Sequence, residues 1–153
     1  MGTLELKIPP PAVSALVAAM MWGISRLTVP LEVPGLIRVV VAVLLVLTGA
    51  CIGIAGVVAF RHGKTTINPM KPQTTSTLIS SGIYRFSRNP MYVGILFALA
   101  AWAIFLSSTW AMIGPVAFVL YINRFQIEPE ERVLAGMFGA AYADYKSAVR
   151  RWV

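Results

Sequence analysis

An unbroken apolar tract of 32 residues, from 91 to 122, most constrains what this chain can fold into. A helix needs roughly 20 residues to cross the hydrocarbon core of a bilayer, so the tract is too long for one ordinary crossing. A Ser-Ser-Thr sequence at 107–109 lies at its midpoint. We therefore predict a helical hairpin whose arms, 91–106 and 110–122, are joined by a turn at the far side of a membrane.

Two more apolar runs, 12–25 and 39–60, precede the hairpin. The chain of 153 residues is 58% hydrophobic and only 12% charged, which is too little polar surface to coat a water-soluble globule of this size. The run 39–60 is a full span. The first run reaches that length if it extends to Val29 and tolerates Arg26, whose long stem carries its charge to an interface. We expect an all-α integral membrane protein with about four transmembrane helices, in one domain covering residues 1–153.

Small residues recur along the second run, at Gly49, Gly53 and Gly56. Spacings such as that from Gly49 to Gly53 put them on one side of a helix, where a neighbouring helix can approach closely. We favour close helix packing at this face, and a ligand groove there is the alternative interpretation.

Basic residues predict the orientation in the membrane. The segment 61–88 has five lysines and arginines, Lys64 among them, and no acidic residue, and the segment 124–151 has another five. The connection before the second run has only Arg26 and Arg38. Cytoplasmic loops carry an excess of lysine and arginine, so both rich segments should lie on the cytoplasmic side. Four crossings satisfy this, because the hairpin returns the chain to the side on which it entered.

The net charge of +7 has the same explanation. Basic residues beside apolar spans contact anionic lipid or fix topology, and no basic run here is long enough to indicate a nucleic-acid site. We therefore expect the lipid bilayer, and no nucleic acid, as a partner. Because the chain is short, we favour a bacterial or archaeal inner membrane, with the C-terminus in the cytoplasm.

The segment after the hairpin predicts an amphipathic helix. Three glutamates and Pro129 lie at its start, where the helix dipole favours acids and a proline is tolerated. One apolar face is formed at spacings of three and four residues by Leu134, Phe138, Tyr142, Tyr145 and Val149. We expect an interfacial helix that lies over the cytoplasmic mouth of the bundle and bends where Gly136 and Gly139 weaken it.

A polar segment, GIYRFSRNPMYVG at 82–94, lies directly before the hairpin. Charged groups beside a bilayer are more often solvated anchors, and glutamates at a helix start more often interact only with its dipole. The hairpin, however, brings this segment and the acidic start of the last helix to the same side of the membrane. Together they would form a cleft that holds a polar cofactor, with an apolar wall for a lipid.

These segments resemble a known family. The sequences LISSGIYRFSRNPMYVG and EPEERVLAGMFGAAYADYKSAV are similar to those of the integral-membrane methyltransferases that include isoprenylcysteine carboxyl methyltransferase and the phospholipid N-methyltransferases. The resemblance covers residues 78–149, about half of the chain. It implies S-adenosylmethionine as methyl donor, bound at the cytoplasmic face by segments 76–94 and 124–149, and a lipidic or small apolar acceptor. The sequence has no glycine-rich turn after a predicted strand, so nothing in it indicates a Rossmann-type site instead. Methyl transfer from a sulfonium requires no metal.

By motif position, the resemblance assigns donor binding to twelve residues. They are Ser76, Thr77, Leu78, Ile79, Tyr84, Arg88, Asn89, Pro90, Met91, Tyr92, Glu130 and Glu131. Arg88 and Glu130 are also expected to act in catalysis. We expect Arg88 to hold the methionyl carboxylate through two hydrogen bonds and Glu130 to bind the ribose hydroxyls or the amino group. Tyr84 or Tyr92 would stack on adenine or lie beside the sulfonium.

Two positions depart from the family pattern. The histidine of its Arg-His-Pro element is Asn89 here, which forms hydrogen bonds but does not titrate. Prenylcysteine-specific members have an arginine four residues before the donor-binding glutamate, where this chain has Gln126, and the nearest arginine is Arg124. We expect Gln126 and Arg124 to contact the substrate. A neutral amide in place of a cation weakens the case for a carboxylate acceptor, and leaves methylation of O, N or S open.

Two other functions are compatible with the same residues. A membrane binding or assembly module could keep the methyltransferase fold without catalysis, and a reductase with a similar bundle would need a nicotinamide site. The sole histidine, His62, is interpreted as interfacial, with a role as base for an amine acceptor as the alternative. Binding of S-adenosylhomocysteine would separate the enzyme from the module.

Overall fold

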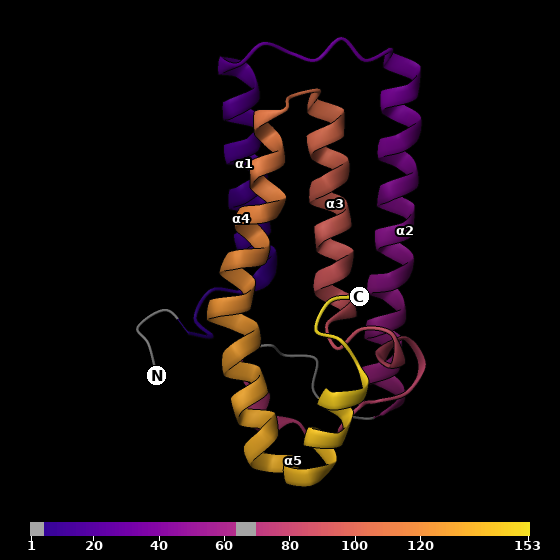
Figure 1. The fold of residues 1–153 in the computed structure, drawn as a ribbon, viewed down its shortest axis with the longest axis vertical. Coiled ribbons are helices and arrows are strands. Elements are labelled where there is room, and N and C mark those ends of the chain that lie inside the picture. Colours follow the sequence, from indigo (N-terminus) through magenta and orange to yellow (C-terminus); the bar gives the residue numbers. More distant parts are fainter. Residues whose placement is uncertain (1–4, 64–69) are drawn as a thin grey trace.

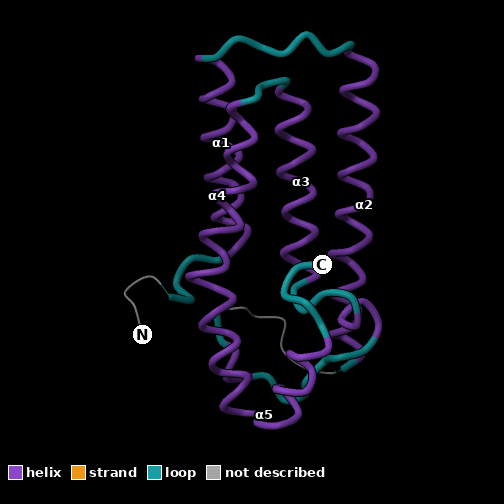
Figure 2. The backbone as a smooth tube through the Cα atoms, in the orientation of Figure 1, coloured by secondary structure: helices purple, strands orange, loops and turns teal. Residues whose placement is uncertain are grey.

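The computed structural model describes residues 5–63 and 70–153, and within them it contains helices and loops and no strand (Figures 1 and 2). Lys64, one of the basic residues behind the predicted orientation, lies outside these ranges. The long helices are α1 (Pro10–Leu27), α2 (Gly35–His62), α3 (Pro90–Leu106), α4 (Ile113–Ile122) and α5 (Glu128–Ala148). The first four run side by side, which confirms the all-α architecture (Figure 1).

The predicted hairpin turn is confirmed. Helix α3 ends at Leu106, Ser107 adopts the left-handed conformation (φ 49°), and a 3-10 turn (Trp110–Met112) leads into α4. The α1–α2 connection lies at this same end of the bundle and is tied to the turn (Figure 1). The Leu31 amide donates to the Ser107 carbonyl at 2.6 Å, and the Arg38 guanidinium donates to the Ser107 hydroxyl at 3.2 Å. These bonds fix the end of the bundle opposite to the polar segments.

The small residues of α2 pack against α3, as favoured from their spacing. A Cβ at Gly49 would lie 2.7 Å from the carbonyl oxygen of Gly94, and a Cβ at Gly94 would lie 2.7 Å from that of Gly49. Nearer the polar end, a Cβ at Gly56 would lie 2.9 Å from the side chain of Met91. Backbones this close leave no room for a groove at this contact, so the glycines determine where α2 lies along α3.

The buried core lies between α1, α3 and α4. Phe118 and Ile122 of α4 are fully buried, and Gly114 lies against the Met21 side chain of α1. The Trp102 indole of α3 donates to the Ala18 carbonyl of α1 at 3.0 Å. The core thus holds α3 and α4 in the register that brings their polar ends together.

Helix α2, by contrast, exposes much of its apolar surface. Among the helices that the structure describes it alone is long and apolar enough to cross a membrane, with 17% of its most apolar window buried. Helix α3 is apolar but has 17 residues. Both findings agree with a membrane protein, and the four crossings stay a prediction.

The last helix does not begin separately near Pro129, as its sequence predicted, and its position at a membrane interface stays a prediction. A π-helical turn (Asn123–Ile127) joins α4 to α5, and the first half of α5 continues beyond the other helices (Figure 1). Pro129 lacks an N–H and would clash with the preceding helical turn, and the wider π turn directly before it accommodates this residue. The chain reverses at Gly139 (φ 50°, ψ −122°), one of the two glycines at which a bend was predicted.

Candidate functional site

A pocket lies at the polar end of the bundle, between the end of α2, the α2–α3 connection, the start of α3 and both halves of α5. Its volume is about 820 Å³, its open mouth included. It is lined by Phe60, Pro72, Thr75, Thr77, Leu78, Ile79, Tyr84, Arg88, Asn89, Met91, Tyr92, Ile127, Glu130, Glu131, Leu134, Tyr142 and Tyr145.

Ten of the twelve residues assigned to donor binding line this pocket. Arg88 and Glu130, which are 42 positions apart in the sequence, are among them. Ser76 and Pro90 are not, and Pro90 is buried at the first position of α3. The two segments quoted from the sequence therefore contribute walls of one cavity.

Glu130 lies in the first turn of α5 and is held from two sides. The Tyr92 hydroxyl and the Gln126 amide each donate to its Oε1 at 2.8 Å. Burial raises the pKa of the Glu130 carboxyl to about 7 from its ordinary value of 4.5, although the two hydrogen bonds act in the opposite direction. The carboxyl can therefore hold or release a proton near neutral pH.

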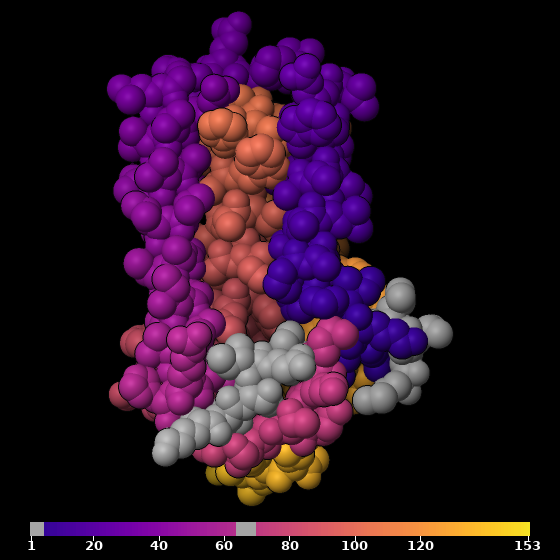
Figure 3. All heavy atoms as spheres, turned by 180° about the vertical axis from the view of Figure 1, so that it is seen from behind, coloured from indigo at the N-terminus to yellow at the C-terminus, as the bar shows by residue number. Residues whose placement is uncertain are grey.

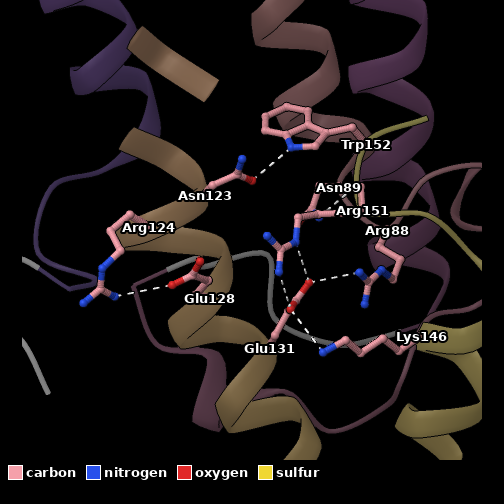
Figure 4. Close-up of polar contacts among 9 residues, drawn as sticks. All are labelled: Arg88, Asn89, Asn123, Arg124, Glu128, Glu131, Lys146, Arg151 and Trp152. Atoms are coloured by element: carbon pink, nitrogen blue, oxygen red, sulfur yellow. Dashed lines mark hydrogen bonds and ion pairs between the residues drawn. The ribbon is translucent and has the colours of Figure 1, made fainter. Parts of the chain in front are cut away.

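Glu131, the neighbouring carboxylate, lies within a cluster of cations (Figure 4). Arg151 donates to both of its oxygens, at 3.0 and 2.9 Å, Arg88 Nη2 lies 3.1 Å from Oε1, and Lys146 Nζ lies 3.6 Å from Oε2. Burial raises the pKa of Glu131, but the hydrogen bonds from Arg151 and the charges of Arg88 and Lys146 outweigh it and lower the pKa overall. Glu131 is therefore ionised near neutral pH, whereas Glu130 titrates in that range.

Arg88 carries unused hydrogen-bonding capacity inside the pocket. Its side chain is 9% exposed, and its Nε and Nη1 have no hydrogen-bond partner among the residues that the structure describes. Buried polar groups without a partner are rare in proteins, because the loss of hydration is costly. The two edges through which a guanidinium forms paired hydrogen bonds are Nε/Nη2 and Nη1/Nη2, and Nη2 of Arg88 contacts Glu131, so Arg88 has single hydrogen bonds from Nε or Nη1 left for a further anion.

Aromatic side chains form another wall. The rings of Phe60 and Tyr84 meet edge to face, with centroids 5.3 Å apart, and those of Tyr142 and Tyr145 are 6.4 Å apart. The Tyr145 hydroxyl donates to the Tyr84 carbonyl at 2.8 Å, which joins the second half of α5 to the turn before α3. Burial raises the pKa of Tyr84 and of Tyr145, so both phenols stay neutral.

Seven lining residues were not assigned a site role from the sequence. They are Phe60, Pro72, Thr75, Ile127, Leu134, Tyr142 and Tyr145. Tyr142 and Tyr145 belong to the predicted apolar face of the last helix, and only the reversal of the chain at Gly139 brings them to the pocket. Nothing in the local sequence marks Phe60 as a site residue, because it is one apolar residue at the end of a long apolar run.

The two residues expected to contact the substrate do not line the pocket. Gln126 is buried and donates to Glu130, so it acts on that carboxyl rather than on a ligand in the cavity. Arg124 is exposed and pairs with Glu5 at 3.2 Å and with Glu128 at 3.4 Å. His62 is exposed at the end of α2 and is also absent from the pocket wall.

Asn89, which replaces the usual histidine, has a visible structural role. Its side-chain amide donates to the carbonyl of Arg151 at 2.9 Å. The five residues 149–153, which we call the C-terminal strap, thus lie against the start of α3 (Figure 4). An amide serves this contact without any change of protonation.

Seen from behind, the described part of the α2–α3 connection, in magenta, lies at the polar end of the bundle (Figure 3). Above that connection the space-filling view shows α3 lying between α1 and α2. The polar end is thus the part of the molecule where loop and helix segments from distant positions gather.

Comparisons with known proteins confirm the family resemblance seen in the sequence. The sequence model of the phospholipid methyltransferase family matches residues 37–141. An uncharacterized protein of Haemophilus influenzae is 44% identical over 63 residues, which are 41% of this chain and 100% of that protein. No solved structure matches.

Two named relatives are enzymes. The protein-S-isoprenylcysteine O-methyltransferase of Saccharomyces cerevisiae is 30% identical over 94 residues, covering 58% of this chain and 37% of the enzyme. That of Mus musculus is 32% identical over 113 residues, covering 69% and 38%. The chain therefore spans little more than a third of the length of either enzyme.

Proposed function

The chain belongs to the phospholipid methyltransferase family, and on that premise we propose that its pocket binds S-adenosylmethionine and transfers the methyl group to a lipidic or small apolar acceptor. One observation carries the proposal. Arg88, whose Nε and Nη1 are buried without a hydrogen-bond partner among the described residues, lines a cavity that also has an aromatic wall and the buried carboxyl of Glu130. This combination of anion site, apolar wall and hydrogen-bond acceptor suits the donor, which has a carboxylate, an aromatic base and ribose hydroxyls.

The residues of the pocket divide among the parts of the donor. Arg88 would bind the methionyl carboxylate through its positive charge and a hydrogen bond from Nε or Nη1, which have no partner among the described residues. Glu130 would accept hydrogen bonds from the ribose hydroxyls or the amino group. Tyr84, Tyr142 and Phe60 would pack on the adenine or beside the sulfonium.

When bound, the donor supplies an activated methyl group for in-line displacement by a nucleophile. The chain contributes position, and holding reactants in line is worth roughly 7–11 kcal/mol. A carboxylate or thiolate acceptor needs no base, whereas an amine must first lose a proton. Glu130, with a pKa of about 7 and a place in the pocket wall, is the group that can take that proton.

The acceptor would reach the pocket from the bilayer. Helix α2 exposes Leu44, Leu47 and Ile54, as expected for a lipid-facing helix, and its last turn contributes Phe60 to the pocket. The excess of lysine and arginine in the two basic segments supports a donor site and a C-terminus on the cytoplasmic side of an inner membrane. An isoprenylcysteine carboxylate is one candidate acceptor, supported by the names of the two enzymes described above.

Transfer of a labelled methyl group tests the proposal. Purified protein is incubated with labelled donor and either total membrane lipid or thiol, amine and carboxylate model acceptors. We expect labelled product from wild-type protein and a loss of at least tenfold in Arg88→Ala and Glu130→Gln, since each removes a charged or buried hydrogen-bonding group. Arg85→Ala is the matched control, because Arg85 is exposed and three residues from Arg88. No label in any acceptor class would favour a non-catalytic membrane module.

A further inference from the structure

The C-terminal strap is fixed to the pocket wall by its backbone and by one tryptophan. The Arg88 amide donates to the Arg150 carbonyl at 3.0 Å, and the Trp152 indole donates to the Asn123 side chain at 3.0 Å. The Trp152 ring also packs against the core cluster. Figure 4 shows two neighbouring residues of the strap reaching different partners: Trp152 points toward Asn123, and Arg151 points toward Glu131. These contacts fix where the intervening residue, Arg151, presents its side chain.

Arg151 is the strongest partner of Glu131. Its Nε and Nη2 each donate to a different carboxylate oxygen, at 3.0 and 2.9 Å, so the planar fork of the guanidinium occupies both oxygens. Arg88 approaches the same carboxylate through Nη2 alone, at 3.1 Å. Lys146 is 3.6 Å away with a half-exposed side chain, which makes it a weak substitute.

This division of contacts determines which donor atoms of Arg88 remain available for a ligand. A buried carboxylate without a cation of its own would draw the Arg88 guanidinium into a two-bond contact, because such pairs are the strongest that arginine forms. Arg151 prevents this by satisfying Glu131, and the Nε and Nη1 of Arg88 remain without a partner among the described residues. The cluster of one carboxylate and three cations also keeps a net positive charge for an incoming anion.

We propose that Arg151 is a positioning residue for the donor carboxylate: it neutralises Glu131 from the C-terminal strap and so keeps Arg88 free to bind that carboxylate. The inference rests on the proposed function, since it takes S-adenosylmethionine as the ligand. Arg151 acts through Glu131 and Arg88.

A pair of ligands separates this role from simple support of the fold. S-adenosylhomocysteine carries the carboxylate, whereas 5′-methylthioadenosine keeps the adenosine and sulfur and lacks it. In Arg151→Ala we expect affinity for S-adenosylhomocysteine to fall about tenfold, because one charge-assisted contact is weakened, and affinity for 5′-methylthioadenosine to stay unchanged. Arg150→Ala is the matched control, because it removes the same charge from the adjacent, exposed position of the strap. It should bind both ligands as the wild type does.

A second substitution tests the role of Glu131 directly. If Arg151 acts by neutralising Glu131, then Glu131→Gln combined with Arg151→Ala should recover most of the lost affinity for S-adenosylhomocysteine. Arg151→Lys, which keeps the charge but not the fork, should lie between the wild type and Arg151→Ala. Affinities are measured by isothermal titration of detergent-purified protein.

The possible results are distinguishable. No binding of S-adenosylhomocysteine to wild-type protein would overturn the proposed function and this inference with it. Wild-type binding with Arg151→Ala equal to Arg150→Ala would overturn the inference alone. Equal loss of both ligands in Arg151→Ala, or no recovery in the double variant, would reduce Arg151 to a structural contact and overturn the positioning role.

Discussion

The raised pKa of Glu130 predicts a pH-dependent stability that one substitution should remove. In the folded protein the carboxyl has a pKa of about 7, raised mainly by burial, against an ordinary value of 4.5. The folded state therefore binds a proton that the unfolded chain has released between these two pH values. Stability from this group is present below pH 4.5 and is lost as the pH rises through 7. Glu130→Gln cannot ionise and should lack this loss.

The size of the effect follows from the shift. Each pKa unit corresponds to about 1.4 kcal/mol, so the rise from 4.5 to about 7 is worth about 3 kcal/mol of unfolding free energy. For a chain of this length that is a difference of roughly 6–12 °C in melting temperature. Between about pH 5 and pH 8, the wild type should lose that much stability relative to Glu130→Gln.

Thermal unfolding of detergent-purified protein across this pH range measures the difference. Glu128→Gln is the matched control, because it changes the same side chain two positions earlier, where the carboxylate is 40% exposed. It should follow the wild-type pH dependence. Parallel curves for the wild type and Glu130→Gln would refute the argument that Glu130 is buried as an acid with a raised pKa.

Three further predictions concern the packing and the charges around the pocket. Gly49→Ala should destabilise the protein by about 1–3 kcal/mol, because its Cβ would lie 2.7 Å from the Gly94 carbonyl oxygen. A Cβ at Gly53 would meet nothing within 4 Å, so Gly53→Ala should be tolerated. Thermal unfolding compares the two variants. Gln126→Leu removes a hydrogen bond that lowers the pKa of Glu130, so the midpoint of the Glu130-dependent stability profile should move to higher pH, and an unmoved midpoint would contradict the contact. S-adenosylhomocysteine binding near neutral pH should release a proton from Glu130, because the ligand's ammonium group favours the ionised carboxylate. Isothermal titration in buffers of different ionisation enthalpy would detect the released proton. The proton release should vanish in Glu130→Gln.

Local patterns in the sequence were sufficient for the hairpin and the helix contact. The apolar tract was too long for one helix, and the chain turns at Ser107, where a small polar residue adopts a left-handed conformation. The spacing of Gly49 and Gly53 indicated a small-residue face, and Gly94 lies against it. From the hairpin alone, Arg88 and Glu130 were expected on one side of the bundle, and both line the pocket.

Contacts between distant segments could not be predicted. Arg124, whose contact with a substrate stays a prediction, pairs with Glu5, which is 119 positions earlier and carries no recognisable signal. Pro129 indicated the start of a new helix, whereas the π turn before it lets α4 and α5 continue as one. The strap depends on contacts such as that between Asn89 and Arg151, which form only after α5 has reversed at Gly139.

Equilibrium binding of S-adenosylhomocysteine most directly tests whether the two distant segments form one donor site. We predict saturable binding by wild-type protein and by Arg85→Ala, and a loss of at least tenfold in Arg88→Ala with helicity and melting behaviour retained. No binding at millimolar ligand, or an Arg88→Ala variant that binds as tightly as Arg85→Ala, would contradict the account.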